Sequence, residues 1–164
     1  MNKKYSNGLY GGKFMPMSLA HYHCLSVAAQ ECDTVYCILF YNGPEEQEIK
    51  KYNYEQYLSL TNRAEQLYRV CSYYKNVKPI ILDIHSCHNK DGSANLDLET
   101  PLVLQACGVG IEAIYGTNRN YKEYYERAYP YAIYRLIDPD HKYLNISSTE
   151  LRNMPIAERK EWII

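Results

Sequence analysis

A glycine, a lysine, a serine and a histidine lie close together in the stretch GGKFMPMSLAHYHC near the start of the chain. Gly12 lets a ligand approach the backbone. Lys13 and His21 supply positive charge, and Ser18 stands where a helix would begin, with N–H groups that attract anions. This pattern favours a phosphate site. An ordinary strand-to-helix turn with a capping serine and a surface histidine would also contain these residues.

A second group of candidate ligands lies in the stretch ISSTELR near the other end of the chain. Ser148 and Thr149 offer hydroxyl groups, and Arg152, about one turn later, can bind phosphate oxygens with its forked guanidinium. Ser147 and Glu150 also have the spacing of a capping box, which is the simpler interpretation of this stretch alone. The two interpretations are compatible, because a capped helix start keeps free N–H groups.

Apolar runs alternate along the chain with stretches of helical periodicity, and this alternation predicts a parallel sheet. We expect strands at residues 9–14, 34–41, 78–84, 111–115 and 131–137, and helices at 19–30, 54–74, 98–107 and 120–128, with two more after Ser148 divided by Pro155. The run TVYCILFY is typical of a strand that is buried on both faces. The fold class is therefore α/β, with a five-stranded parallel sheet and helices on both faces.

The predicted sheet brings the two candidate groups together. In open parallel sheets, ligands bind beyond the carboxyl ends of the strands, at the topological switch point. The turn from Gly12 to His21 leaves the first strand at this end, and the segment that contains Arg152 follows the fifth strand. We therefore expect the two segments to meet in space although they are far apart in the sequence.

The composition excludes several other classes of protein. A formal net charge of -1 over 164 residues does not suit a nucleic-acid groove or an anionic membrane surface. No apolar run approaches a membrane span, and the start MNKKYS has no signal-peptide character, which together indicate a cytoplasmic protein. Six scattered cysteines predict reduced, buried thiols. His85, Cys87 and His88 are close in sequence but too few for a zinc site, so we expect no protein-held metal.

Both stretches resemble the signatures of one superfamily. GKFMPMSLAH is similar to the G-[KR]-F-x-P-x-[HT]-x-G-H signature of nucleotidyltransferases, and ISSTELR is similar to their I-S-x-T-x-x-R signature. The end of the chain, LIDPDHKYLNISSTELR, resembles the NMN adenylyltransferase domain of bifunctional NMN adenylyltransferase/ribosylnicotinamide kinases, where NMN is nicotinamide mononucleotide. The resemblance implies one Rossmann-like nucleotidyltransferase domain over residues 1–164, with no kinase domain after it and no DNA-binding domain before it.

The resemblance assigns roles to individual residues. It implies that His21, Lys13 and Arg152 are catalytic. The residues it implies for ATP binding are Gly12, Phe14, Ser18, Thr117, Asn118, Ser148 and Thr149. Asn42 and Asp83, with the 85–97 segment, are expected to form the acceptor pocket. The chain departs from the signature at two positions, since Ser18 replaces a histidine or threonine and Ala20 replaces a glycine.

The implied reaction is transfer of AMP from ATP to NMN, which gives NAD and pyrophosphate. Mg²⁺ would be carried mainly by the phosphates of ATP. The expected partners are ATP and a small phosphorylated acceptor, without nucleic acid or membrane, and the family often forms homo-oligomers. Two alternatives stay open: a cytidylyl- or adenylyltransferase for another phosphorylated acceptor, and a nucleotide-binding module that has lost turnover through the changes at Ser18 and Ala20.

Overall fold

The computed structural model describes residues 2–43, 58–140 and 148–159. Its strands are β1 (Tyr5–Gly12), β2 (Cys32–Tyr41), β3 (Val77–Asp83), β4 (Ala113–Gly116) and β5 (Ile133–Leu136). Its helices are α1 (Leu19–Glu31), α4 (Leu60–Cys71), α5 (Leu96–Cys107), α6 (Lys122–Ala128), α7 (Ser148–Asn153) and α8 (Ile156–Arg159), with single 3₁₀ turns at His85–Cys87 and Arg119–Tyr121.

The five strands form one parallel sheet in the order β3-β2-β1-β4-β5, as the sequence predicts. The chain first builds outward from β1 to β3 and then returns to place β4 on the other side of β1. The topological switch point therefore lies between β1 and β4, where Tyr10 is in register with Tyr115. The turn after Gly12 leaves the sheet beside this point.

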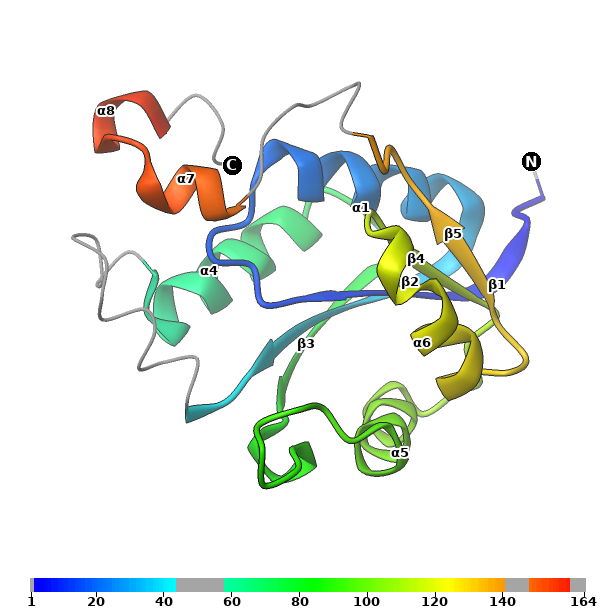
Figure 1. Ribbon diagram of the computed structural model, residues 1–164. Coiled ribbons are helices and arrows are strands. Elements are labelled where there is room, and N and C mark those ends of the chain that lie inside the picture. The colour runs from blue at the N-terminus through cyan, green and yellow to red at the C-terminus, as the bar shows by residue number, and fades with distance from the viewer. Residues whose placement is uncertain (1, 44–57, 141–147, 160–164) are drawn as a thin grey trace.

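Helices cover both faces of the sheet (Figure 1). On one face, Leu25 of α1 and Leu67 of α4 belong to a buried apolar cluster with the sheet. On the other face, Val103 of α5 belongs to a second cluster, with Tyr125 of α6 packed against it. The prediction of helices on both faces is confirmed, and the candidate turn belongs to the face covered by α1 and α4.

The central strand β2 shows why the apolar run at residues 34–41 is continuous. Val35, Cys37 and Leu39 face the cluster under α1 and α4, whereas Tyr36 and Ile38 face the cluster under α5 and α6. A strand covered on both faces favours apolar side chains along its covered length. All six cysteines of the chain are buried and unpaired, which confirms the expectation of buried thiols.

The helix predicted at residues 54–74 differs from the structure at both its end and its buried face. Residues 54–57 lie outside the described residues, and α4 ends at Cys71. Helical spacing places Tyr68 on one face with Leu60, Leu67 and Cys71, but this tyrosine is exposed. Arg63 and Gln66 are instead buried among the apolar residues of the helix. Helical periodicity shows which positions share a face of the helix. It cannot show which polar side chains are buried because they have hydrogen-bond partners in the interior.

The last two elements follow the prediction: α7 and α8 are separated at Pro155, which cannot continue a helix. The stretch YNGPEE also predicts the start of a helix, and this prediction falls on residues 44–57, outside the described part of the chain. No helix in the described ranges has both the length and the apolar character needed to cross a membrane.

Candidate active site

The turn after β1 is built around the ring of Phe14. This residue has a φ of +50°, which is uncommon for a residue other than glycine. Its buried ring folds back so far that a Cβ at position 12 would lie 2.9 Å from Phe14 Cε1, so a larger residue there would displace the ring. The same ring meets Tyr10 and His21 edge to face, at centroid distances of 5.7 and 5.2 Å. Gly12 therefore makes room for Phe14, which in turn packs against His21.

Ser18 and His21 form a close pair at the start of α1. Ser18 is the residue before the helix and only 1% exposed. Its backbone N–H donates to His21 Nδ1 at 2.9 Å, and its hydroxyl oxygen lies 3.2 Å from the same nitrogen. Ser18 is thus turned toward the imidazole rather than toward solvent, and its position in the fold is that of a capping and orienting residue.

The surroundings of His21 favour the neutral form of its imidazole. Because burial penalises the charged form, the pKa of this imidazole falls from the usual 6.5 to about 4. Nδ1 accepts the Ser18 N–H bond, so the ring proton is carried by Nε2. Without ligand, the lowered pKa disfavours the positive charge that the sequence predicts for His21. The residue instead offers one oriented N–H donor, which suits a phosphate oxygen equally well.

The two candidate segments meet, as the sequence predicts. Arg152 of α7 donates from Nη1 to the carbonyl oxygen of Met15 at 2.8 Å. Its Nη2 is 3.3 Å from the hydroxyl of Thr149, which lies one turn earlier on the same helix. Lys13 is exposed in the turn that Arg152 contacts. The side chain of Ser148 and the whole of Ser147 lie outside the described residues.

Two residues of α4 contact the same turn and are not among the predicted site residues. Arg63 Nη1 donates to the Lys13 carbonyl at 3.1 Å. Gln66 accepts from the Met17 N–H at 3.1 Å and donates to the Met17 carbonyl at 3.2 Å. A signal for them exists in the sequence, since both lie on the helix face of Leu67 and Val70, where polar residues are unexpected.

The predicted adenine-binding residues follow β4, next to the switch point. Thr117 is partly exposed there, and Asn118 is exposed. The Asn118 side chain accepts from the backbone N–H of Asn120 at 2.9 Å, and its carbonyl accepts from the Tyr134 hydroxyl at 3.0 Å. The backbone of this loop is thereby fixed at the ligand-binding edge of the sheet.

An ion pair joins the loops after β4 and β5 at the same edge. Arg119 contacts both carboxylate oxygens of Asp140, at 2.6 and 3.2 Å. Two residues before Asp140, Asp138 has a φ of +44°, in the left-handed region that favours turns. The loops that would flank a nucleotide are therefore connected to each other.

The two residues predicted to bind the acceptor form contacts with different histidines of the 84–88 turn. Asn42, at the end of β2, is 3% exposed, and its Nδ2 lies 3.3 Å from His88 Nε2. Asp83, at the end of β3, accepts from the backbone N–H of His85 and contacts its imidazole at 2.7 Å. Both residues stand at the carboxyl edge of the sheet, but Asn42 orders the 84–88 turn from inside and Asp83 is exposed outside it.

Metal-ligating side chains do not gather at this edge. Within residues 2–43, 58–140 and 148–159, no three His, Cys, Asp or Glu side chains lie together as a metal site would require. Of the three clustered residues in the 85–88 segment, Cys87 is buried, and the two histidines contact different partners.

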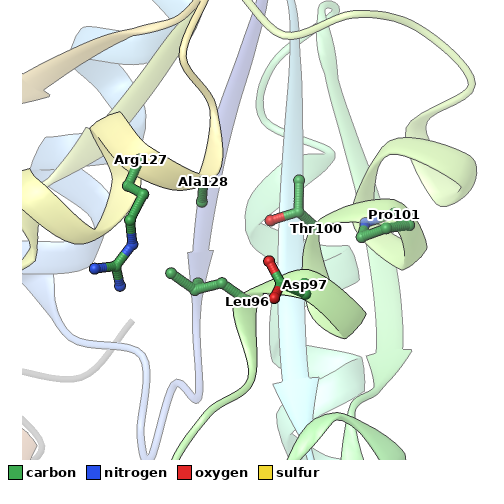
Figure 2. A pocket seen from close by; sticks show the side chains of 6 residues that line it. All are labelled: Leu96, Asp97, Thr100, Pro101, Arg127 and Ala128. Atoms are coloured by element: carbon green, nitrogen blue, oxygen red, sulfur yellow. The ribbon is translucent and has the colours of Figure 1, made fainter.

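A pocket of about 260 Å³ lies elsewhere, between α5 and α6 (Figure 2). Asp97 and Thr100 of α5 and Arg127 of α6 are among the residues that line it. These helices cover the face of the sheet opposite to α1 and α4. None of the predicted site residues lines this pocket, so it is separate from the candidate nucleotide site.

Comparison with known proteins gives one family and one fold. The model of the cytidylyltransferase-like family matches residues 9–154. No curated protein sequence matches the chain. Among solved structures, the NadR protein in complex with NAD and AMP-PNP is similar, with a TM-score of 0.69 and 18% identity, over 99% of this chain and 46% of that one. A bifunctional NMN adenylyltransferase/ADP ribose pyrophosphatase from Francisella tularensis is similar with a TM-score of 0.63 and 20% identity, over 91% of this chain and 41% of that one.

The chain thus spans less than half the length of these proteins. At this level of identity, the likeness shows the fold, a Rossmann-like α/β domain with a parallel sheet. A further NadR structure, in complex with NR, has a TM-score of 0.68 and 17% identity, over 99% of this chain and 43% of that one. The family model points to the same superfamily as the two sequence signatures.

Proposed function

Since the chain belongs to the cytidylyltransferase-like family of nucleotidyltransferases, we propose that it transfers AMP from ATP to NMN, giving NAD and pyrophosphate. One observation carries the proposal. The hydrogen bond from Arg152 to the Met15 carbonyl joins the two segments with phosphate-binding residues beside the switch point. A guanidinium, an exposed lysine, and an imidazole N–H thereby come from elements that meet at one edge of the sheet.

These groups suit the chemistry of nucleotidyl transfer. The acceptor phosphate oxygen attacks the α-phosphorus of ATP, the bond to the bridging oxygen breaks, and pyrophosphate leaves. A phosphate monoester has a second pKa of about 6, so it is largely dianionic at neutral pH and needs no general base. Alignment and charge stabilisation are then the main tasks of the protein.

The residues divide these tasks by their charge. Lys13 and Arg152 bring full positive charges to the triphosphate. His21 donates its Nε2 proton in a hydrogen bond, in an orientation set by Ser18. Such a preorganised donor stabilises the charge that grows on the oxygens of the leaving pyrophosphate. The imidazole keeps its proton throughout.

Mg²⁺ is part of the proposal as a companion of ATP. Hydroxyl, imidazole and cationic groups dominate the described site, and this donor set suits an ion held by phosphate oxygens better than one held by the protein. When bound, the ion would neutralise phosphate charge. No step of the proposal depends on a protein ligand to it.

NMN is favoured as the acceptor by the end of the chain and by its neighbours in fold. The segment around ISSTELR resembles the NMN branch of the superfamily. The NadR structures contain NAD and NR, and the Francisella tularensis protein is described as an NMN adenylyltransferase. Asn42 and Asp83, at the ends of β2 and β3, are the side chains we propose to approach the acceptor.

A pyrophosphate-release assay tests this function. The purified protein is offered ATP or CTP with NMN, nicotinic acid mononucleotide and other phosphate monoesters, and we expect release with ATP and NMN. The His21→Ala variant, prepared in parallel, controls for contaminating enzymes. Release only with CTP, or only with an acceptor other than NMN, would show that the substrates differ from those proposed. ATP binding without pyrophosphate release from any pair would favour a binding module.

A further inference from the structure

Three alternate residues of the turn after β1 are held through their backbone groups by side chains from other elements. The Lys13 carbonyl accepts from Arg63, and the Met15 carbonyl accepts from Arg152. Both backbone groups of Met17 pair with Gln66. Two of these three contacts come from α4, whose residues the proposed chemistry does not use.

The Gln66 contact fixes the residue immediately before the helix start. Gln66 is 8% exposed, and its side-chain amide makes paired hydrogen bonds with the N–H and the carbonyl of Met17. The next residue, Ser18, orients His21 through its own backbone N–H. Displacement of Met17 would therefore move the donor that defines which imidazole nitrogen carries the proton.

The Arg63 contact fixes the other end of the turn. Arg63 is 1% exposed, and its guanidinium donates from Nε to the Leu58 carbonyl at 2.8 Å and from Nη1 to the Lys13 carbonyl at 3.1 Å. Burial of a cation is costly, and an apolar side chain of similar size would pack without that cost. A fork of two donors, however, sets the distance between α4 and the backbone that carries Lys13.

We propose that Arg63 and Gln66 are positioning residues of the nucleotide site, which hold residues 13–17 so that Lys13 and the first turn of α1 face the same ligand. Neither side chain needs to touch the nucleotide. This inference rests on the proposed function for the identity of the ligand. The geometry of the clamp itself, formed by Arg63, Gln66 and the backbone of residues 13–17, can be measured without any ligand.

Two variants and one matched control test the clamp. Gln66→Met keeps a long unbranched side chain and removes both hydrogen bonds to Met17. Arg63→Lys keeps the charge, but a single ammonium cannot reach the Leu58 and Lys13 carbonyls in the way that the fork does. Glu65→Gln changes the neighbouring, exposed residue of the same helix and should behave as wild type.

The first readout is the protonation of His21 followed by NMR without nucleotide. In the wild type and in Glu65→Gln, we expect a neutral ring between about pH 5 and pH 8, with the proton on Nε2. In Gln66→Met, the ring should become more exposed and titrate within that range, toward the ordinary value of about 6.5. A loss of bulk stability alone would leave the His21 titration of the folded protein unchanged.

The second readout is ATP affinity by calorimetry, which we expect to fall at least about tenfold in both variants and to stay unchanged in the control. If both variants fold and keep the wild-type His21 titration and ATP affinity, the proposal is wrong. If both lose cooperative unfolding altogether, the two residues serve the fold alone and the proposal is also wrong. If the wild type binds no ATP, the proposed function fails, and the His21 titration still decides whether the clamp exists.

Discussion

Arg152 Nη1 donates to the carbonyl oxygen of Met15, 2.8 Å away in space and 137 residues earlier in the chain. This hydrogen bond connects α7 to the turn that leaves β1. A guanidinium has five N–H donors in a fixed plane, so one edge can hold the carbonyl while another binds a phosphate. The arrangement ties the position of α7 to the conformation of the turn.

Arg152→Lys should therefore weaken ATP binding by at least about tenfold, which corresponds to about 1.4 kcal/mol. Lysine keeps the charge but loses the fork, so it cannot contact both the Met15 carbonyl and a phosphate in one geometry. Calorimetry with ATP measures the effect. Arg127→Lys, an exposed change on α6, is the matched control, and equal affinities of the two variants would contradict a role for the Arg152 fork.

His21→Ala should lower kcat by roughly 10²-fold or more, the scale of losing one preorganised donor. The reason is the loss of the Nε2–H donor, because a neutral imidazole contributes a hydrogen bond rather than a charge. Steady-state kinetics with ATP and NMN give the number. His23→Ala removes the histidine two residues later, which points to another side of the helix, and should keep kcat within about threefold. Wild-type kcat in His21→Ala would rule out this donor.

Ser18→Ala distinguishes capping from phosphate binding. The buried hydroxyl faces His21 Nδ1, so its removal should lower the free energy of unfolding by about 1 kcal/mol, as for other helix caps. ATP affinity should change less than about threefold, because the backbone N–H that orients the imidazole remains. Urea unfolding and calorimetry measure the two effects. A large loss of affinity with unchanged stability would instead place the hydroxyl on a phosphate.

The fold follows from the sequence because its main signals are local. Strand and helix periods, together with the parallel arrangement that alternating elements require, predict all five strands. The same topology predicts that the segments containing Gly12 and Arg152 meet at the carboxyl edge of the sheet. Sequence signatures add the superfamily, which the family model over residues 9–154 confirms.

The details of the site depend on contacts that no local pattern contains. Nothing around Arg63 or Gln66 shows that their partners are backbone groups some 50 residues earlier. The charge of His21 depends on how deeply the ring of Phe14 and the helix start bury it, which is a property of the packed protein. The role of Ser18 likewise becomes visible only when its hydroxyl is seen to face the imidazole.

Stability should depend on pH through the pair of Glu31 and Arg135, which joins the end of α1 to β5. Arg135 donates to both carboxylate oxygens, at 2.6 and 3.0 Å, and the Tyr115 hydroxyl donates to one of them at 2.8 Å. These hydrogen bonds, with that of Arg135 the largest cause, lower the pKa of the Glu31 carboxyl from 4.5 to about 2. The unfolded chain therefore takes up this proton first as the pH falls.

The stabilisation from Glu31 is thus fully present above about pH 4.5 and is lost as the pH falls toward 2. Glu31→Gln should lower the free energy of unfolding at pH 7 by about 1 to 3 kcal/mol, because it leaves the Arg135 guanidinium without its carboxylate. The variant should also lose the part of the acid dependence that belongs to this group. Urea titrations at several pH values measure both effects.

Glu126→Gln is the matched control, because its pair with Lys122 is an exposed contact within one helix and such pairs contribute little. It should leave the curve of stability against pH close to that of the wild type. If Glu31→Gln follows the wild-type curve between pH 2 and pH 7, the carboxyl of Glu31 does not join α1 to the edge strand in the way the hydrogen bonds indicate.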